Sequence, residues 1–264
     1  MPRNESLSFA GRASRALDKR GFETLNSSGT FALVPKKIAI SQSNYIPWKG
    51  YFNLIKSVDE FILLDNVQYT RRDWRNRNLI KTPQGLRWLT IPVDVKGQFT
   101  CTIEQVKTFG HAWRQDHWNL LSQAYQKAPF FNQYKDTIRT ILLDSAEDNL
   151  SKINLTFIKA INSCLDIQTP IRWAHEFAPK PGKNERLIDI CQQLGGTVYL
   201  SGPAAKEYLD EGLFAQSGIA VEWANYEGFP EYEQLYPPFV HGVSVLDLLF
   251  TKGPTSPNYL KPRV

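Results

Sequence analysis

The sequence predicts an α/β fold in which a mostly parallel, Rossmann-like sheet carries a three-helix insertion. Short apolar segments alternate with amphipathic ones, and this alternation is typical of parallel sheets whose strands are joined by helices. Residues 37–41 and 60–65 are apolar or β-branched and are bounded by loop residues, as buried strands are. Between residues 112 and 166 the pattern is helical throughout, which indicates an insertion or a small second domain.

The first two apolar segments frame a strand–helix–strand unit. Tyr51, Phe52 and Ile55 recur at helical spacing, so residues 48–58 are expected to form a helix between the two strands. A unit of this length normally gives two parallel strands joined by a right-handed crossover.

The remaining elements follow from the same criteria. Residues 86–93 are expected to form a third strand, which Pro92 confines to an edge or to the strand's exit. Breaks at Ala128-Pro129 and near Asn149 divide residues 112–166 into three helices. Beyond them, the pattern predicts strands at 171–177, 197–201 and 219–226, and helices at 185–194, 204–215 and 243–250.

The composition and the distribution of charge argue against a nucleic-acid-binding protein. The chain has 264 residues, 42% hydrophobic, and a formal net charge of +5 that is concentrated in residues 1–35 and 70–77. Such a distribution favours local anion sites over a nucleic-acid-binding face. Residues 1–36 are rich in Arg, Ser and Gly and are predicted to be a disordered or loosely attached extension of a domain at 37–264.

Three scattered cysteines, Cys101, Cys164 and Cys191, predict a reducing, cytoplasmic location without a disulfide scaffold. No apolar stretch reaches the length of a membrane span. Neither phosphate-loop motifs nor His/Cys spacings typical of zinc sites occur. No cofactor or metal is therefore predicted beyond a nucleotide-diphosphate ligand, which Mg²⁺ could accompany.

A loop dense in amides and aromatic rings follows the first predicted strand. Gln42 and Asn44 can each donate and accept hydrogen bonds, and Tyr45 and Trp48 offer flat faces for a base or a sugar. Because open α/β sheets bind ligands at the carboxyl ends of their strands, these four residues are expected to contact a ligand. The alternative is a capped loop with two core aromatics.

The second strand ends at Asp65, and the loop after it holds four arginines between residues 71 and 77. These arginines would repel one another without an anion, and the guanidinium fork matches a phosphate or a carboxylate. Asp65 could fix a hydroxyl or an amine, or orient an arginine. The alternative is a solvated basic loop. The residues of this loop expected to bind a ligand are Gln68, Arg75, Asn76 and Arg77.

Two later segments add candidates. Ser201 or Gly202 is expected to cap a helix that begins at Pro203, which would expose backbone amides to an anion. His241 lies in a segment rich in proline, glycine and aromatic residues and could act as a general acid or base. The alternatives are an ordinary capped helix and a structural histidine.

Together these motifs resemble the WbqC-like proteins, from Lys37 to the C-terminus. The family's gene context implies a part in the synthesis of bacterial O-antigen or another surface polysaccharide. Many members have His-Gln-Pro where this chain has Ser41-Gln42-Ser43, so a histidine there is dispensable. The resemblance is carried by Gln42-Ser-Asn-Tyr-Ile-Pro-Trp-Lys-Gly-Tyr-Phe52, Asp65-Asn-Val-Gln-Tyr69, Trp74-Arg-Asn-Arg77, Trp88-Leu-Thr-Ile-Pro-Val93, Tyr199-Leu-Ser-Gly-Pro203 and His241-Gly-Val-Ser244.

The residues and the resemblance lead to one functional hypothesis. The protein is expected to transfer an acyl or aminoacyl group from a donor to an amino sugar carried on a nucleotide diphosphate. Arginines and helix amides would hold the diphosphate, aromatic rings would stack on the base or sugar, and Asp65 or His241 would accept the proton of the attacking amine. The alternative is a non-catalytic module that binds a nucleotide sugar or a glycan.

Overall fold

The computed structural model describes residues 23–25, 31–33 and 35–263. The chain divides into two compact units, Met1–Val34 and Pro35–Val264. In the first unit, strands β1 (Glu23–Leu25) and β2 (Phe31–Leu33) form an antiparallel pair. Most of the extension predicted at 1–36 lies outside the described residues, so its looseness stays a prediction.

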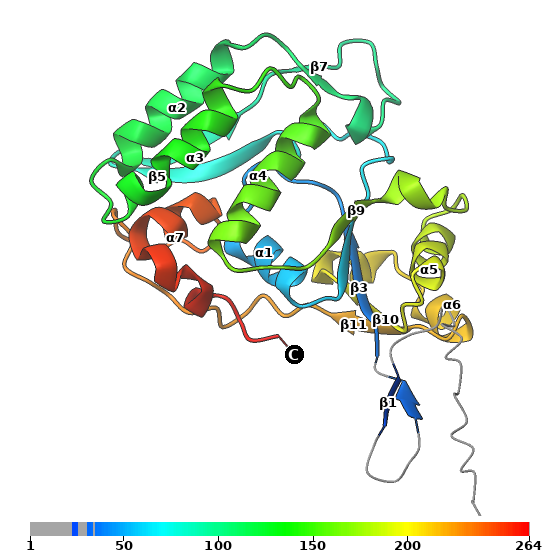
Figure 1. The fold of residues 1–264 in the computed structure, drawn as a ribbon. Coiled ribbons are helices and arrows are strands. Elements are labelled where there is room, and N and C mark those ends of the chain that lie inside the picture. The colour runs from blue at the N-terminus through cyan, green and yellow to red at the C-terminus, as the bar shows by residue number, and fades with distance from the viewer. Residues whose placement is uncertain (1–22, 26–30, 34, 264) are drawn as a thin grey trace, which may run out of the picture. The chain divides into compact units, whose positions relative to one another are not determined.

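A five-stranded sheet, parallel at every pairing, forms the centre of the second unit (Figure 1). Its strand order is β11-β10-β3-β4-β9. The predicted α/β class and the parallel pairing of the first two strands are therefore confirmed. The strands are β3 (Lys37–Ser41), β4 (Glu60–Leu63), β9 (Ile171–Trp173), β10 (Val198–Ser201) and β11 (Ala220–Trp223).

Both faces of the sheet are covered, because alternate side chains of a strand point to opposite faces. Ile38 and Ile40 pack with helices α5 (Asn184–Gln193) and α6 (Glu211–Gln216), while Ala39 belongs to the larger core on the other face. Helix α1 (Lys49–Lys56) contributes to that larger core. Figure 1 shows α5 and α6 on one side of the strands, with α1 and α4 on the other.

The predicted stretch of three helices is confirmed. The helices are α2 (Ala112–Tyr125), α3 (Phe131–Leu143) and α4 (Leu150–Cys164). Arg114 of α2 donates hydrogen bonds to the backbone oxygens of Ile141 and Leu142 at the end of α3, at 3.3 and 3.0 Å, and so ties two of the helices together.

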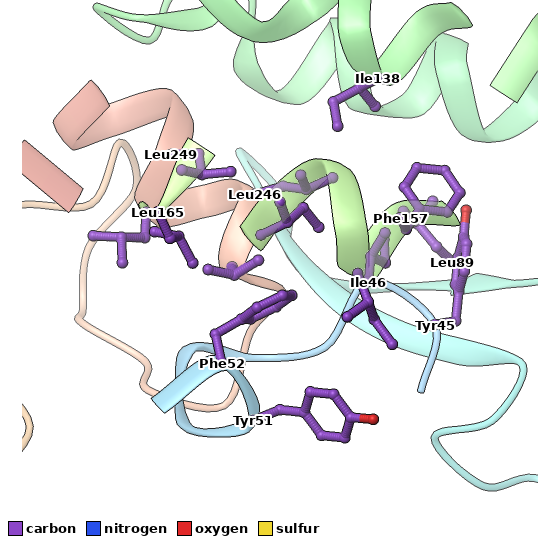
Figure 2. Close-up of a cluster of buried hydrophobic side chains, with 14 of the residues drawn as sticks. Tyr45, Ile46, Tyr51, Phe52, Leu89, Ile138, Phe157, Leu165, Leu246 and Leu249 are labelled. Carbon is purple, nitrogen blue, oxygen red and sulfur yellow. The ribbon is translucent and has the colours of Figure 1, made fainter. Parts of the chain in front are cut away.

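These helices share the larger core with α1 and with α7 (Val245–Lys252), whose first turn is capped by the Ser244 hydroxyl. Figure 2 shows Phe52 of α1, Phe157 of α4 and Leu246 of α7 among the side chains that converge there. Most of the helical stretch is therefore part of the main core and does not form a separate domain.

The structure contains a strand within the predicted range 86–93, but this strand does not join the parallel sheet. Strand β6 (Gly85–Thr90) pairs in an antiparallel hairpin with β5 (Arg77–Thr82), and β7 (Val93–Asp94) pairs with β8 (Lys107–Thr108). Only Leu89 of β6 is buried, whereas a strand inside a parallel sheet is buried on both faces. Apolar residues alone did not reveal which partner the strand would choose.

Two further boundaries differ from the predictions. The helix expected at 204–215 is a 3₁₀ turn, η3 (Pro203–Glu207), followed by α6, because Asp210 accepts hydrogen bonds from the amides of Gly212 and Leu213 and starts a new helix. The strand expected at 171–177 ends at Trp173 and continues as η2 (Ala174–Phe177). Two more 3₁₀ turns are η1 (Ile103–Gln105) and η4 (Gly253–Tyr259).

Acid is expected to destabilise the fold through His117 of α2. Its ring is buried, its Nδ1 lies 2.9 Å from the Tyr45 hydroxyl, and burial lowers the pKa of the imidazole to about 4. The unfolded chain takes up a proton near pH 6.5 and the folded chain only near pH 4, so this contribution to stability is lost as the pH falls through that interval. Such a difference in pKa is worth about 3 kcal/mol.

Urea unfolding between pH 7 and 4 measures this loss, with His117→Asn as the matched variant. Asparagine keeps a hydrogen-bonding group near the Tyr45 hydroxyl but does not titrate. The difference in unfolding free energy between wild type and variant should change by about 3 kcal/mol over this range. A difference that does not vary with pH would show that His117 is not buried in the neutral form.

Candidate functional site

A cavity of about 570 Å³ opens at the carboxyl edge of the parallel sheet, and we name it the edge cavity. Residues at or just after the ends of four strands line it, among them Gln42, Leu64, Ser201, Gly202 and Tyr226. Gln42 and Ser201, which were both expected to contact a ligand, therefore open on the same edge, whereas Asp65 does not line the cavity.

The edge cavity carries positive charge. Arg75, Lys183 and Arg186 line it, and no aspartate or glutamate is found among the described residues of its wall. Arg75 is mostly buried; it lies 3.4 Å from the Asp73 carboxylate, and its Nε has no partner among the described atoms. Three cations in one cavity favour an anionic ligand there.

A buried polar network fixes the loop that carries Arg75. Asn154 of α4 donates from Nδ2 to the Arg75 carbonyl at 2.9 Å and to the Ser43 hydroxyl at 3.0 Å. The backbone amide of Tyr45 donates to the carbonyl of Trp74 at 3.0 Å. The two loops that follow β3 and β4 are therefore held to each other and to α4, so Arg75 is presented by a braced backbone.

Asp65 belongs to the same network and does not line the edge cavity. It is completely buried, and its carboxylate accepts hydrogen bonds from the Ser43 amide at 2.8 Å and from the Ser151 hydroxyl. Burial raises the pKa of Asp65, although the hydrogen bonds from Ser151 and Ser43 oppose the rise. Through these contacts Asp65 positions the Gln42–Asn44 loop.

Trp48 forms an aromatic wall of the edge cavity. Its ring lies edge-to-face on Tyr226 and Phe229, with centroids 5.2 and 5.7 Å away. A Cβ at Gly50 would come within 2.1 Å of the Trp48 ring, so only glycine allows the indole to lie over the start of α1.

A smaller cavity of about 370 Å³, which we name the side cavity, shares Asn44, Trp48, Trp74 and Tyr226 with the edge cavity. His241 lines it, with its ring 4.5 Å from that of Phe239. Burial and the nearby Lys49 lower the pKa of His241, while Glu231 opposes them, so the imidazole is neutral at neutral pH.

Lys49 anchors the segment that carries Tyr226 and His241. Its ammonium donates to the carbonyl of Pro230 at 2.6 Å and lies 5.3–5.6 Å from the ring centroids of Phe229, Tyr232 and Phe239. Burial lowers the pKa of Lys49 to about 8. The lysine is enclosed by aromatic rings, as cation–π contacts require, and joins this segment to α1.

Four residues predicted to bind a ligand lie outside both cavities. Tyr45 is buried in the core, where its hydroxyl contacts His117 and its ring packs on Phe157. Gln68, Asn76 and Arg77 bond to the carbonyls of Phe99, Ile91 and Arg72, respectively.

Arg77 also stacks on Trp88 at 4.2 Å; its Nε, like that of Arg75, has no described partner, but Arg77 lines neither cavity. Lys183, Arg186, Trp74 and Tyr226 line the edge cavity but were not among the predicted binding residues. Trp74 belongs to the motif Trp74-Arg-Asn-Arg77, and no local motif marks the other three.

No helix in the described part of the chain is long and apolar enough to cross a membrane. Within the same described ranges, no three His, Cys, Asp or Glu side chains are grouped so that they could hold a metal ion.

Comparison with known proteins places the chain in a family. The model of the WbqC-like protein family matches residues 42–259. A protein of Mycobacterium tuberculosis (strain ATCC 25618 / H37Rv), named Uncharacterized protein Rv1507c, is 47% identical over 226 residues, which cover 86% of this chain and 98% of that protein. No solved structure matches the chain. Because the family model covers residues 42–259, well over half of the chain, the chain belongs to the WbqC-like protein family.

Proposed function

We propose that the edge cavity binds the diphosphate of a nucleotide-linked sugar. One observation carries this proposal: Arg75, Lys183 and Arg186 line a single cavity whose described wall contains no Asp or Glu, the nearest carboxylate to Arg75 being that of Asp73, 3.4 Å away and outside the wall. Arginine pairs bidentately with phosphate oxygens, and lysine adds a point charge. The hydroxyl of Ser201 and the backbone at Gly202 lie in the same wall and can complete the contacts.

The aromatic residues of the wall suit the rest of such a ligand. Trp48, Trp74, Tyr208 and Tyr226 line the edge cavity beside the three cations. Flat rings of this kind stack on a base or pack against the C–H face of a sugar, and Gln42 and Asn44 can pair with polar edges. A phosphate next to a ring system is the chemistry of a nucleotide sugar.

For the reaction, we propose transfer of an acyl or aminoacyl group to an amino sugar in the synthesis of a bacterial surface polysaccharide. The amine attacks the carbonyl carbon of an activated donor, a C–N bond forms, and the donor's leaving group departs with the bonding electrons. His241 accepts the proton that the amine loses, because a lowered pKa keeps its imidazole neutral. Asp65 contributes by positioning the Gln42–Asn44 loop.

A non-catalytic module that binds a nucleotide sugar is the second candidate. It is favoured by the lack of acidic side chains among the described residues of either cavity, which leaves His241 as the main group for proton transfer. The three cysteines are unpaired, which agrees with a reducing cytoplasm for either function.

Substitution of His241 by glutamine separates the two candidates. If His241 is the general base, turnover of a nucleotide-linked amino sugar with an acyl or aminoacyl donor should fall by about 10²–10⁴, with little change in sugar-nucleotide binding. Product formation by mass spectrometry measures the rate, and His175→Gln, an exposed histidine that lines neither cavity, is the control. Full turnover by His241→Gln would exclude it as the base. Binding without turnover in the wild type would favour the module.

A further inference from the structure

The edge cavity and the side cavity adjoin, and their walls differ in chemistry. Asn44, Trp48, Trp74 and Tyr226 line both, so one ligand that passes these four residues can occupy both spaces. All three cations of the site lie on the edge cavity, and none of them lines the side cavity. The two spaces therefore suit two different parts of a ligand.

The side cavity suits an uncharged group. Its described wall contains no Lys, Arg, Asp or Glu, and the pKa of its one histidine, the partly exposed His241, is lowered by partial burial and by the nearby Lys49. The groups near His241 are the Phe239 ring, the Lys49 ammonium of α1 and the Glu231 carboxylate, whose oxygen lies 3.9 Å away. A phosphate or carboxylate in this space would find no paired charge, and its desolvation would be costly.

The side cavity has few hydrogen-bonding side chains, and they differ in whether the protein already supplies their partners. The Asn78 amide donates to the carbonyls of Tyr45 and Ile46, at 3.1 and 3.0 Å, and accepts from the Leu79 amide, so the fold uses it fully. Asn44 differs, because its Oδ1 is buried and has no described partner. A buried acceptor without a partner calls for a ligand O–H or N–H at the junction of the two cavities.

We infer that the side cavity holds the sugar ring of the nucleotide-linked amino sugar, while the edge cavity holds its diphosphate. This inference rests on the proposed function and deepens it. The C–H face of the ring packs on Trp48 or Trp74, and a ring hydroxyl or the amino group donates to Asn44 Oδ1. The amino group then lies on the side of the site that His241 lines, where its proton is to be removed.

Gly242 offers a way to fill the side cavity without disturbing the rest of the site. It lines the side cavity alone, its φ is ordinary, and a Cβ there would meet no atom within 4 Å. A series of Gly242→Ala, Gly242→Val and Gly242→Phe therefore adds bulk in steps at the wall of the side cavity. Ala215→Phe on α6 adds the same bulk at an exposed position that lines neither cavity, and serves as the control.

Calorimetry should compare uridine, thymidine and guanosine diphosphates with their glucosamine conjugates. We expect the preferred conjugate to bind the wild type at least tenfold more tightly than the diphosphate alone. Gly242→Phe should weaken the binding of the conjugate at least tenfold and change the affinity for the diphosphate less than twofold. If phenylalanine impairs folding, as judged by circular dichroism, the alanine and valine variants should show the same trend in smaller steps.

Other outcomes separate the two proposals. If the series weakens the binding of the diphosphate and of its conjugate equally, or the binding of neither, the side cavity does not hold the sugar. Only this inference then falls. This inference also falls if the series weakens the binding of an acyl donor but not that of the conjugate, because the donor would then occupy the side cavity. If the wild type binds no member of the panel, the proposed function falls first.

Discussion

Replacement of Arg75 by glutamine is expected to weaken the binding of a nucleotide-linked sugar about ten- to a hundredfold. Arg75 is mostly buried in the wall of the edge cavity, and its Nε lacks a partner among the described atoms. A charge-assisted contact is worth about 1.5–3 kcal/mol, which corresponds to that loss of affinity. Calorimetry with a nucleotide sugar at fixed salt measures it.

Arg77→Gln is the matched control for Arg75→Gln. It removes the same charge two residues away, but Arg77 stacks on Trp88 and lines neither cavity. Binding should therefore stay within about twofold of wild type. If both variants bind as tightly as wild type, the edge cavity is not the anion site; an equal loss in both would mean that the general charge of the loop matters and not the contact of Arg75.

Truncation of Asp65 to alanine is expected to cost about 2–6 kcal/mol of unfolding free energy. The change leaves two buried donors, the Ser43 amide and the Ser151 hydroxyl, without an acceptor, and each loss costs about 1–3 kcal/mol. The loop that presents Gln42 and Asn44 to the edge cavity would also lose its anchor. Urea unfolding measures the stability, and ligand binding should weaken in parallel.

Asp65→Asn tests whether the role of Asp65 is structural. Asparagine keeps an acceptor for the Ser43 amide, and the Ser151 hydroxyl can rotate to accept from the new NH₂ group. Most of the stability should therefore return, together with most of any turnover. A stable Asp65→Asn protein that binds its ligand and has lost turnover by 10² or more would instead identify Asp65 as the general base.

The parallel sheet could be predicted because its signals are local. Each of its strands is a short, mostly apolar segment between loop residues, and the helices beside it show their own period. The β5–β6 hairpin could not be placed, because β5 has only two adjacent apolar residues between polar and charged ones, and β6 resembles an edge strand. Periodicity identifies a strand but does not identify its partner.

The candidate site was predictable to the level of its loops. Gln42, Asn44 and Trp48 reach the cavities because they directly follow β3, and a parallel sheet opens at that edge. Tyr45 is adjacent to Asn44 but turns into the core, where it meets His117 of α2. A sequence shows that a loop is rich in polar and aromatic groups, but not which side chain turns inward.

The cations Lys183 and Arg186 could not have been found from sequence. They lie more than a hundred residues after Arg75, at the start of α5 and among ordinary helix-surface residues. Only the packing of α5 on the sheet brings them to the edge cavity. The positive charge of the site therefore depends on the fold. Arg75 comes from a recognisable motif, whereas Lys183 and Arg186 come from the start of α5, where no motif marks them.

The most direct test of the proposed anion site is a crystal structure with a nucleotide-linked amino sugar bound at saturating concentration. The diphosphate oxygens should lie within hydrogen-bonding distance of Arg75, with Lys183 or Arg186 on their other side. Density for the ligand elsewhere on the chain, or a bound nucleotide whose phosphates do not touch Arg75, would contradict the assignment of the edge cavity.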